Sequence, residues 1–576
     1  MGRVKYGDHC SAANRARGMP AAKMHTGLAC TAMKADCKES IRTCLYNVRF
    51  GAPRALPEPR AFPYSPMPIS DLSARFAPRT RLCVRAAAIV ATCTALAFAP
   101  PAQARKKSHK EARKTTVVSP AARAAGLPAS VLVALQRAKV PASAMSVVVE
   151  RVGDPEPLIA WNASRPMLPA STMKLVTTFS GLSILGPDYR WRTTAYSDGP
   201  VDPDGTLQGN LYIKGTGDPK LVPEELIDLV DKIRKAGIKR VAGGLVLDKS
   251  YFAASTRDLP SFDDDASAPY NVGPDPLLYA FKAVSFTVTP GEDGKVAVDV
   301  LPPLANLSID NQLVEGGGSC GAAAAAARPT LTAGGGMMTA SFSGDYPLRC
   351  GAHTTNLAIL DHTTFFARGF LALWQQDGGT IAGPVSEGKV PTTARPVAVH
   401  YSPVLGSIVY DINKFSNNVM ARNLFLTIGA VSGKPPATPE QSSRVIQAFL
   451  QKNGIAMPDL LLENGSGLSR EEHVSALSLA ALLQAANASP VAQAFVDSLP
   501  IAGIDGTMKN RLTNADVLGN AHIKTGTLRD VRAIAGYVAG ADGQSYIVVS
   551  FINNDHAEAA RAAHDTLLEW IYTGAH

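Results

Sequence analysis

Residues 169–185 read Pro-Ala-Ser-Thr-Met-Lys-Leu-Val-Thr-Thr-Phe-Ser-Gly-Leu-Ser-Ile-Leu and predict a helix that begins after Pro169. Because Ser171 and Lys174 are three positions apart, a helix places the hydroxyl and the amine on one face. Burial lowers the pKa of an amine, which lets it act as a base toward a neighbouring hydroxyl. The helix N-terminus also directs backbone N–H groups toward developing negative charge. The stretch therefore predicts a serine nucleophile; the alternative is a capping serine followed by a surface lysine.

The same Ser-x-x-Lys pattern occurs a second time, at Ser386-Glu-Gly-Lys389. This copy lies in a connector rich in Pro, Gly and Thr, residues 383–396, where no regular element would hold the two side chains together. The pattern alone is therefore a weak indication of chemistry.

Two further polar stretches suit an acyl-transfer site. Ser416-Asn-Asn418 falls between two helical stretches, where a turn can direct the first and third residues into a cleft. Residues 522–527, His-Ile-Lys-Thr-Gly-Thr, predict an edge strand in which Lys524 and Gly526 share one face. Glycine there lets a substrate backbone approach as an added strand. Lys524 offers positive charge to a carboxylate, and Thr525 offers a hydroxyl.

In this order, Ser-x-x-Lys, Ser-x-Asn and Lys-Thr-Gly resemble the motif set of penicillin-binding proteins and serine β-lactamases. Ser416 follows Ser171 by 245 residues, and Lys524 follows Ser416 by 108. The first gap is too long for a compact β-lactamase and is similar to that of class C low-molecular-mass penicillin-binding proteins, the D-alanyl-D-alanine carboxypeptidase/endopeptidases. Further matching segments extend the resemblance over roughly residues 120–573: Gly215-Thr-Gly-Asp-Pro219, Gly465-Ser-Gly-Leu-Ser-Arg470, Ala502-Gly-Ile-Asp-Gly-Thr507 and Ala535-Gly-Tyr-Val538.

The resemblance implies an α+β fold: a penicillin-binding/β-lactamase-like transpeptidase domain, with an antiparallel sheet flanked by helices, and a large β-rich insertion. Strand-like runs near both ends of the chain independently indicate one sheet built from N- and C-terminal parts. We expect the first part of the catalytic domain at 119–195, the insertion at 196–394 and the second part at 395–576.

Inside the insertion, short β-prone runs alternate with Gly, Pro and Asp. A single helix, at about 223–235, is expected there, and the Gly- and Ala-rich stretches at 316–327 and 334–336 are expected to be exposed loops without a fixed fold. In the second catalytic part, helices are predicted at 403–429, 439–453, 475–486 and 556–572, and strands at 532–538 and 545–552.

The resemblance also implies a role for each motif residue. Asp265, in the acidic run Asp263-Asp-Asp265, would meet the free amine of a diaminopimelate side chain, and a solvated acidic turn is the alternative. Asn464 departs from the Asp expected before Gly-Ser-Gly. The remaining roles are Ser171 as nucleophile, Lys174 as its base, Ser416 as proton relay to the leaving amine, Asn418 as ligand of the acyl-side amide, Lys524 with Thr525 as ligands of the terminal carboxylate, Gly526 as the site of substrate approach, and the backbone N–H groups of Ser171 and Thr527 as the oxyanion hole.

These roles describe a serine D-alanyl-D-alanine carboxypeptidase/DD-endopeptidase that cleaves peptidoglycan stem peptides ending in D-Ala-D-Ala, or D-Ala cross-links, through a Ser171 acyl-enzyme that β-lactams also form. A serine β-lactamase is one alternative, but no Glu-x-x-x-Asn stretch lies between Ser171 and Lys524 to hold a hydrolytic water. A non-catalytic murein-binding scaffold is the other, and the intact motif residues argue against it. No metal or other cofactor is expected, because the histidines lack ligand spacing.

The first 104 residues have the composition of a leader. An arginine-rich stretch, the uncharged run 86–99 and Ala102-Gln-Ala104 follow the order of a secretion signal, so 67–104 predict a signal peptide and a periplasmic protein. The apolar run is too short for a permanent span, so no integral membrane segment is expected after cleavage. Residues 1–66 are expected to be a non-native or disordered extension, or else a cytoplasmic tail. Residues 105–118 predict a basic flexible tail that leaves the protein soluble or peripherally membrane-associated.

Charge and cysteine content agree with this division. The formal charge of +9 would suit nucleic acid, but residues 1–104 hold 15 of the 57 Lys and Arg and only 5 of the 48 Asp and Glu. The remainder is nearly neutral, so no nucleic-acid partner is expected. Only Cys320 and Cys350 lie beyond the leader. In an oxidising compartment they predict a disulfide worth roughly 3–4 kcal/mol; two thiols too far apart to join are the alternative.

Overall fold

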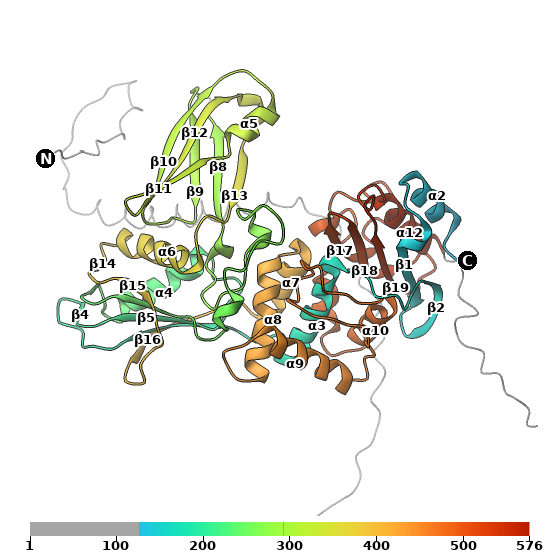
Figure 1. Cartoon of the computed structure of the whole chain (residues 1–576), viewed down its shortest axis with the longest axis horizontal. Coiled ribbons are helices and arrows are strands. Elements are labelled where there is room, and N and C mark those ends of the chain that lie inside the picture. The colour runs from blue at the N-terminus through green and yellow to red at the C-terminus, as the bar shows by residue number, and fades with distance from the viewer. Residues whose placement is uncertain (1–125, 292, 575–576) are drawn as a thin grey trace, which may run out of the picture. The chain divides into compact units, whose positions relative to one another are not determined.

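A five-stranded antiparallel sheet joins the two ends of the described chain, which comprises residues 126–291 and 293–574 of this computed structural model. The blue-green strand β1 lies beside the red strand β19 (Figure 1). The expected sheet of N- and C-terminal parts is therefore confirmed. Its order is β17 (Ala521–Leu528), β18 (Val531–Ala539), β19 (Ser545–Asn553), β1 (Met145–Arg151) and β2 (Asp154–Trp161).

The predicted extension 1–66, signal peptide 67–104 and basic tail 105–118 lie outside the described residues. Among those that are described, no helix is long and apolar enough to cross a membrane.

Helices cover both faces of the central sheet. Alternate residues of β19 divide between two cores: Val548 packs with α2 (Ala129–Arg137) and α12 (Arg561–Thr573), whereas Val549 packs with the helical layer that contains α10 (Ala476–Asn487). Because both faces are buried, β18 and β19 are nearly continuous apolar runs rather than alternating ones. This pattern made the two strands readable in the sequence.

Helix α3 (Lys174–Leu185) lies at the centre of the helical layer. It contacts α7 (Leu405–Phe415), α8 (Asn418–Ser432), α9 (Pro439–Lys452) and α11 (Ala492–Asp497). All residues from Lys174 to Leu182 are buried. Such a helix needs apolar or small side chains on every side, which the sequence supplies. The predicted helix 169–185 begins as a 3₁₀ turn, η3 (Ala170–Met173), and continues as α3.

The middle of the chain forms further sheets around a second core. Pairing of β3 with β16 brings the entry and exit of this region together. Helices α4 (Pro223–Lys235) and α6 (His362–Gln376) contact each other, and α4 also contacts β3 and β16. The five-stranded sheet here has the order β15 (Val385–Glu387), β7 (Leu245–Asp248), β5 (Leu211–Gly215), β3 (Arg192–Ser197) and β16 (Arg395–Tyr401).

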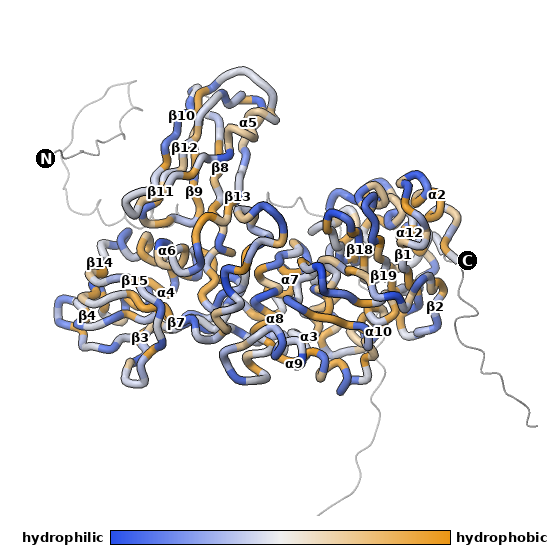
Figure 2. The backbone as a smooth tube through the Cα atoms, in the orientation of Figure 1, coloured by the Kyte–Doolittle hydropathy of each residue, from blue (hydrophilic) through white to orange (hydrophobic). Residues whose placement is uncertain are grey.

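Three smaller sheets complete this region, and the predicted Cys320–Cys350 disulfide is present in it. Hydrophilic stretches occupy many of the loops, and hydrophobic stretches gather in the helices around α8 (Figure 2). The strands of the smaller sheets are β8 (Val284–Pro290), β9 (Val296–Leu301) and β13 (His353–Leu357); β10 (Leu307–Glu315), β11 (Thr330–Gly334) and β12 (Met337–Tyr346); and β4 (Thr206–Leu207), β6 (Arg240–Val241) and β14 (Thr380–Ile381).

Two expectations for this region are wrong. Helix α6 was not predicted, because its Thr, Phe, Trp and Gly residues favour strands or interrupt helices. Its fold follows from tertiary packing: Phe366, Phe370 and Trp374 recur every four residues and stack in sequence. The Ala-rich stretch is not a loop either, since it forms α5 (Cys320–Ala326), capped by Ser319 and buried at Ala323.

Candidate active site

Ser171 and Lys174 come together at the junction of η3 and α3. Lys174 Nζ lies 2.9 Å from Ser171 Oγ, and the Lys174 side chain is fully buried. Burial, followed by the positive charges of Lys524 and Arg422, holds the Lys174 pKa well below its usual range. Ala170, immediately before the serine, has a φ of +45°, a strained conformation for a residue with a side chain. The junction therefore places an amine with a lowered pKa beside the hydroxyl.

Ser416 and Asn418 reach the same place from the turn between α7 and α8. Ser416 ends α7 in the left-handed conformation, with a φ of +56°, and Asn417 caps α8 by accepting the Met420 N–H. Asn418 Oδ1 accepts a hydrogen bond from Lys174 Nζ at 2.7 Å. The Asn418 amide nitrogen donates to the backbone carbonyl of Tyr270 at 3.0 Å. These two contacts fix which end of the Asn418 amide faces the lysine.

Lys524 on the edge strand β17 completes the cluster. Its Nζ donates to Ser416 Oγ at 2.9 Å and to its neighbour's carbonyl, Thr525 O, at 2.7 Å. Burial lowers the Lys524 pKa to about 7. Thr525 Oγ1 donates to Thr507 Oγ1 at 2.8 Å. The structure thus brings all three motifs together at the turn between α7 and α8, where Lys174 contacts Asn418 and Lys524 contacts Ser416.

Close packing between β17 and η3 sets the distance between the motifs. A Cβ on Gly526 would lie 2.7 Å from Pro169 O, so glycine is required where the strand passes the turn. The same contact between β17 and η3 puts the Ser171 backbone beside the strand that carries Thr527. Gly526 therefore admits the chain's own backbone.

A fourth segment, residues 463–468, overlaps the matching stretch 465–470, for which no chemical role was predicted. The Ser466 carbonyl accepts a hydrogen bond from Lys174 Nζ, and the Gly465 carbonyl accepts one from Thr177 Oγ1 at 2.6 Å. A Cβ on Gly467 would lie 1.8 Å from Ala170 O, and the φ of Gly467 is +79°. The two glycines of this segment were the signal in the sequence that a backbone passes close to Ser171.

The hydrogen bonds of Lys174 determine what its amine can do. A neutral amine carries two hydrogens and one lone pair. Asn418 Oδ1 and Ser466 O are both acceptors, so they take the two hydrogens. In that neutral form, the lone pair would face Ser171 Oγ, the third oxygen atom that Nζ contacts, at 2.9 Å. This arrangement can remove a proton from the serine as it attacks a carbonyl carbon.

The acidic turn reaches the cluster through its backbone rather than its carboxylates. Asp265 is exposed, and its Oδ1 accepts hydrogen bonds from the Ser267 hydroxyl at 2.6 Å and the Ser267 N–H at 3.1 Å. Asp263 is bound by Tyr270 and Asn271. Nearby, Arg470 lies over the ring of Phe262 with its guanidinium carbon 4.8 Å from the centroid. The acidic turn therefore contacts the cluster through the Tyr270 carbonyl, which accepts a hydrogen bond from Asn418, whereas the Asp265 carboxylate is hydrogen-bonded to Ser267 within the turn.

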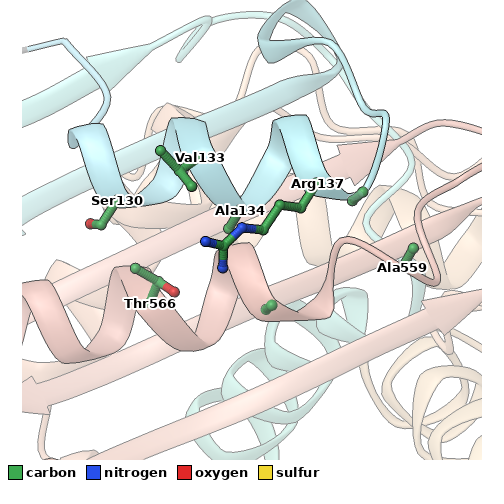
Figure 3. A pocket seen from close by; sticks show the side chains of 8 residues that line it. Ser130, Val133, Ala134, Arg137, Ala559 and Thr566 are labelled. Atoms are coloured by element: carbon green, nitrogen blue, oxygen red, sulfur yellow. The ribbon is translucent and has the colours of Figure 1, made fainter.

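Two features outside this cluster carry no comparable chemistry. A cavity of about 420 Å³ between α2 and α12 is lined by Val133, Ala134 and Thr566, with Arg137 as its charged residue (Figure 3). It contains none of the motif residues. Within residues 126–291 and 293–574, no group of three or more His, Cys, Asp or Glu side chains could hold a metal ion.

Comparisons with known proteins agree on one family. The sequence profile of the D-Ala-D-Ala carboxypeptidase 3 (S13) family matches residues 127–573. The chain is 29% identical over 432 residues to a D-alanyl-D-alanine carboxypeptidase of Actinomadura sp. (strain R39), covering 72% of this chain and 79% of that protein. It is 27% identical over 419 residues to D-alanyl-D-alanine carboxypeptidase DacB of Haemophilus influenzae, covering 71% and 85%.

The fold is shared with a solved structure. Penicillin binding protein 4 (dacB) from Haemophilus influenzae superposes with a TM-score of 0.62 at 24% identity, covering 76% of this chain and 99% of that one. The α+β fold expected from the motifs is thereby confirmed.

Proposed function

The chain belongs to the D-Ala-D-Ala carboxypeptidase 3 (S13) family, and on that premise we propose that it is a serine D-alanyl-D-alanine carboxypeptidase acting on peptidoglycan stem peptides. One observation carries the proposal: the Lys174 amine is buried, has a pKa held well below its usual range, and lies 2.9 Å from Ser171 Oγ while Asn418 Oδ1 and Ser466 O accept its other hydrogen bonds. That is the arrangement a serine acyl-transfer enzyme needs.

Acylation begins when Ser171 Oγ attacks the carbonyl carbon of the penultimate D-Ala. The Oγ–H proton passes to Lys174 Nζ as the carbon–oxygen bond forms. The backbone N–H groups of Ser171 and Thr527 stabilise the oxyanion of the tetrahedral intermediate. Collapse breaks the carbon–nitrogen bond, and the proton held by Lys174 passes through the Ser416 hydroxyl to the departing amine, which leaves Lys174 neutral. Water then hydrolyses the ester and restores the Ser171 hydroxyl.

Lys524, together with Thr525, is proposed to bind the terminal carboxylate of the substrate. Because burial lowers the Lys524 pKa to about 7, the free enzyme holds a mixture of amine and ammonium at neutral pH. A carboxylate favours the ammonium and so raises this pKa on binding. Substrate recognition is therefore linked to proton uptake, and recognition weakens as the pH rises.

The amide of Asn418 is proposed to bind the acyl-side peptide group, and Asp265 the free amine of a diaminopimelate side chain. Support for Asp265 is its place in the turn whose Tyr270 carbonyl contacts Asn418. An exposed carboxylate there is available to an incoming cation. β-Lactams are proposed to acylate Ser171 by the same attack, with their strained amide in the place of the D-Ala peptide bond.

The periplasm is the proposed location of the protein. The Cys320–Cys350 disulfide supports export, because disulfides persist in oxidising compartments. The substrate class supports it too, since peptidoglycan lies outside the cytoplasmic membrane.

The test is release of D-Ala from a stem pentapeptide ending in D-Ala-D-Ala, with a D-Ala cross-linked dimer as second substrate. Wild type and Ser386→Ala are expected to release D-Ala, and Ser171→Ala is expected to release none. One equivalent of penicillin should become bound to the wild type, and the resulting penicilloyl ester should be hydrolysed slowly. Rapid penicillin turnover without D-Ala release would favour a β-lactamase, and no label with no release would favour a scaffold.

A further inference from the structure

A buried carboxylate, Glu472, lies behind the Lys174 site on the far side of segment 463–468. Glu472 is 1% exposed. Its Oε1 accepts the backbone N–H groups of Glu463 at 3.0 Å, Asn464 at 2.9 Å and Gly465 at 2.7 Å. Its Oε2 accepts the Gly467 N–H at 2.7 Å. Four backbone donors around one carboxylate form a set of charge-assisted hydrogen bonds that fixes this segment.

One peptide group connects the carboxylate to the catalytic amine. The Gly467 N–H and the Ser466 C=O belong to the same planar unit. Its N–H donates to Glu472 Oε2, and its carbonyl accepts from Lys174 Nζ. A negative charge at the N–H end draws electron density toward the carbonyl oxygen, so it strengthens the hydrogen bond at the other end.

We propose, on the basis of the proposed acyl-transfer function, that Glu472 is a positioning residue for Lys174. It acts through the Ser466–Gly467 peptide group, which it orients and polarises so that one Lys174 hydrogen is held and the lone pair is left facing Ser171. Glu472 also stabilises the Lys174 ammonium that forms when the serine loses its proton.

The charges around Lys174 give this role a measurable sign. Lys524 on β17 and Arg422 on α8 lower the Lys174 pKa, and Glu472 is the carboxylate that raises it. Four hydrogen bonds from Glu463, Asn464, Gly465 and Gly467 oppose the burial that raises the pKa of Glu472 itself. Loss of the Glu472 charge therefore lowers the Lys174 pKa further. Because acylation slows at acidic pH as Lys174 takes up a proton, this acidic limb of the plot of acylation rate against pH moves to lower pH.

The experiment measures the rate of acylation by a fluorescent penicillin between about pH 5 and 10, a range that lies below the ordinary pKa of a lysine. In Glu472→Gln, we expect the maximal rate to fall by about tenfold or more and the acidic limb to move down by about one pH unit. Glutamine keeps the length of the side chain but places an NH₂ group against at least one of the four backbone donors.

Two matched controls separate charge from position. Glu471→Gln removes the neighbouring exposed carboxylate. It should leave both the maximal acylation rate and the pH of the acidic limb unchanged. Thr177→Val removes the hydrogen bond to Gly465 O, which anchors the same segment without a charge, and should leave the limb unchanged. A limb displaced equally in Thr177→Val, or not displaced in Glu472→Gln, would overturn the proposal.

Glu472→Asp keeps the test decisive if the glutamine variant does not fold. It retains the charge but is one methylene shorter, so the maximal rate should fall by at least about threefold while the limb stays within about 0.3 pH units. An unchanged maximal rate would contradict the positioning role. Wild type and Ser171→Ala are labelled in parallel: an unlabelled wild type would refute the proposed function itself, whereas a labelled wild type with an unaffected Glu472→Gln would refute only this inference.

Discussion

The two copies of Ser-x-x-Lys in this chain lie in opposite surroundings. Ser171 and Lys174 lie at the start of α3, where Lys174 is fully buried and its amine contacts three oxygen atoms. Ser386 lies on the short strand β15, and both Ser386 and Lys389 are exposed. Between them, Glu387 pairs with the cations Lys249 and Arg257.

The difference shows which surroundings the proposed base and nucleophile require. A helical turn puts residues three apart on one face, whereas β15 ends at Glu387, so no regular element holds Ser386 and Lys389 together. Burial, followed by the positive charges of Lys524 and Arg422, lowers the Lys174 pKa, whereas Lys389 is exposed. Spacing in sequence is shared by the two copies; geometry and burial are found only at the first.

The largest expected effect comes from removing each lysine in turn. Lys174→Met keeps a similar shape but has no lone pair to accept the serine proton, so acylation by penicillin should slow by about 10³-fold or more. Lys389→Met should acylate at the wild-type rate. Stopped-flow labelling measures the rate of penicillin acylation of both variants. An equal loss of acylation rate in the two would show that the two copies of the motif do not differ in function.

Lys524 provides the next effect, on recognition rather than on proton removal. Lys524→Met should raise KM for a D-Ala-D-Ala peptide by about 10²-fold, because a partly buried carboxylate loses its charged partner. In the wild type, the same KM should rise as the pH passes about 7, since the Lys524 ammonium loses its proton there. A KM that does not change between pH 6 and 8.5 would contradict this role.

Substitutions of Ser416 separate chemistry from backbone strain. Ser416→Ala and Ser416→Gly both remove the hydroxyl that Lys524 contacts, so both should slow acylation by a similar factor of about 10 to 100. Only glycine relieves the left-handed backbone, where φ is +56°. The glycine variant should therefore be more stable than the alanine variant by about 1 kcal/mol in urea unfolding. Equal stabilities would mean that the turn is not strained.

The smallest expected effect on acylation comes from the disulfide in the region between β3 and β16. The double substitution of Cys320 and Cys350 by Ala should lower stability by roughly 3 kcal/mol in the loop-entropy account. Penicillin acylation of Ser171 should be unchanged, because the cystine contacts none of the motif residues. A change in the acylation rate, measured by the same labelling, would show that the two regions are energetically coupled.

The sequence indicated the central sheet and the motif-bearing elements because their local signals agree with their environment. The runs of β18 and β19 are apolar on both faces, and α4 matches its predicted limits of 223–235. Helix α6 could not be predicted in this way, because its aromatic residues favour strands and only packing makes them helical. The helical stretch predicted over 403–429 consists of α7 and α8, and the predicted junction at Ser416-Asn-Asn418 is confirmed.

The motif residues were found because three stretches carry unusual polar groups in a fixed order. The groups that support them were not found from the sequence. Ser466 and Tyr270 make their contacts through backbone carbonyls, and the residue type gives no indication of such a contact. Glu472 lies in an ordinary-looking Glu-Glu pair, and only the structure shows that it is buried while Glu471 is exposed. Backbone-mediated contacts of this kind depend on tertiary folding, so composition and spacing carry little information about them.

The central claim is that Ser171 is the residue that becomes acylated. Mass spectrometry of the penicillin-treated, proteolysed protein tests it directly by locating the adduct. The account predicts one covalent penicilloyl group, on the peptide that contains Ser171, and none on the peptide that contains Ser386. An adduct on Ser386 or on any other residue, with Ser171 unmodified, would contradict it.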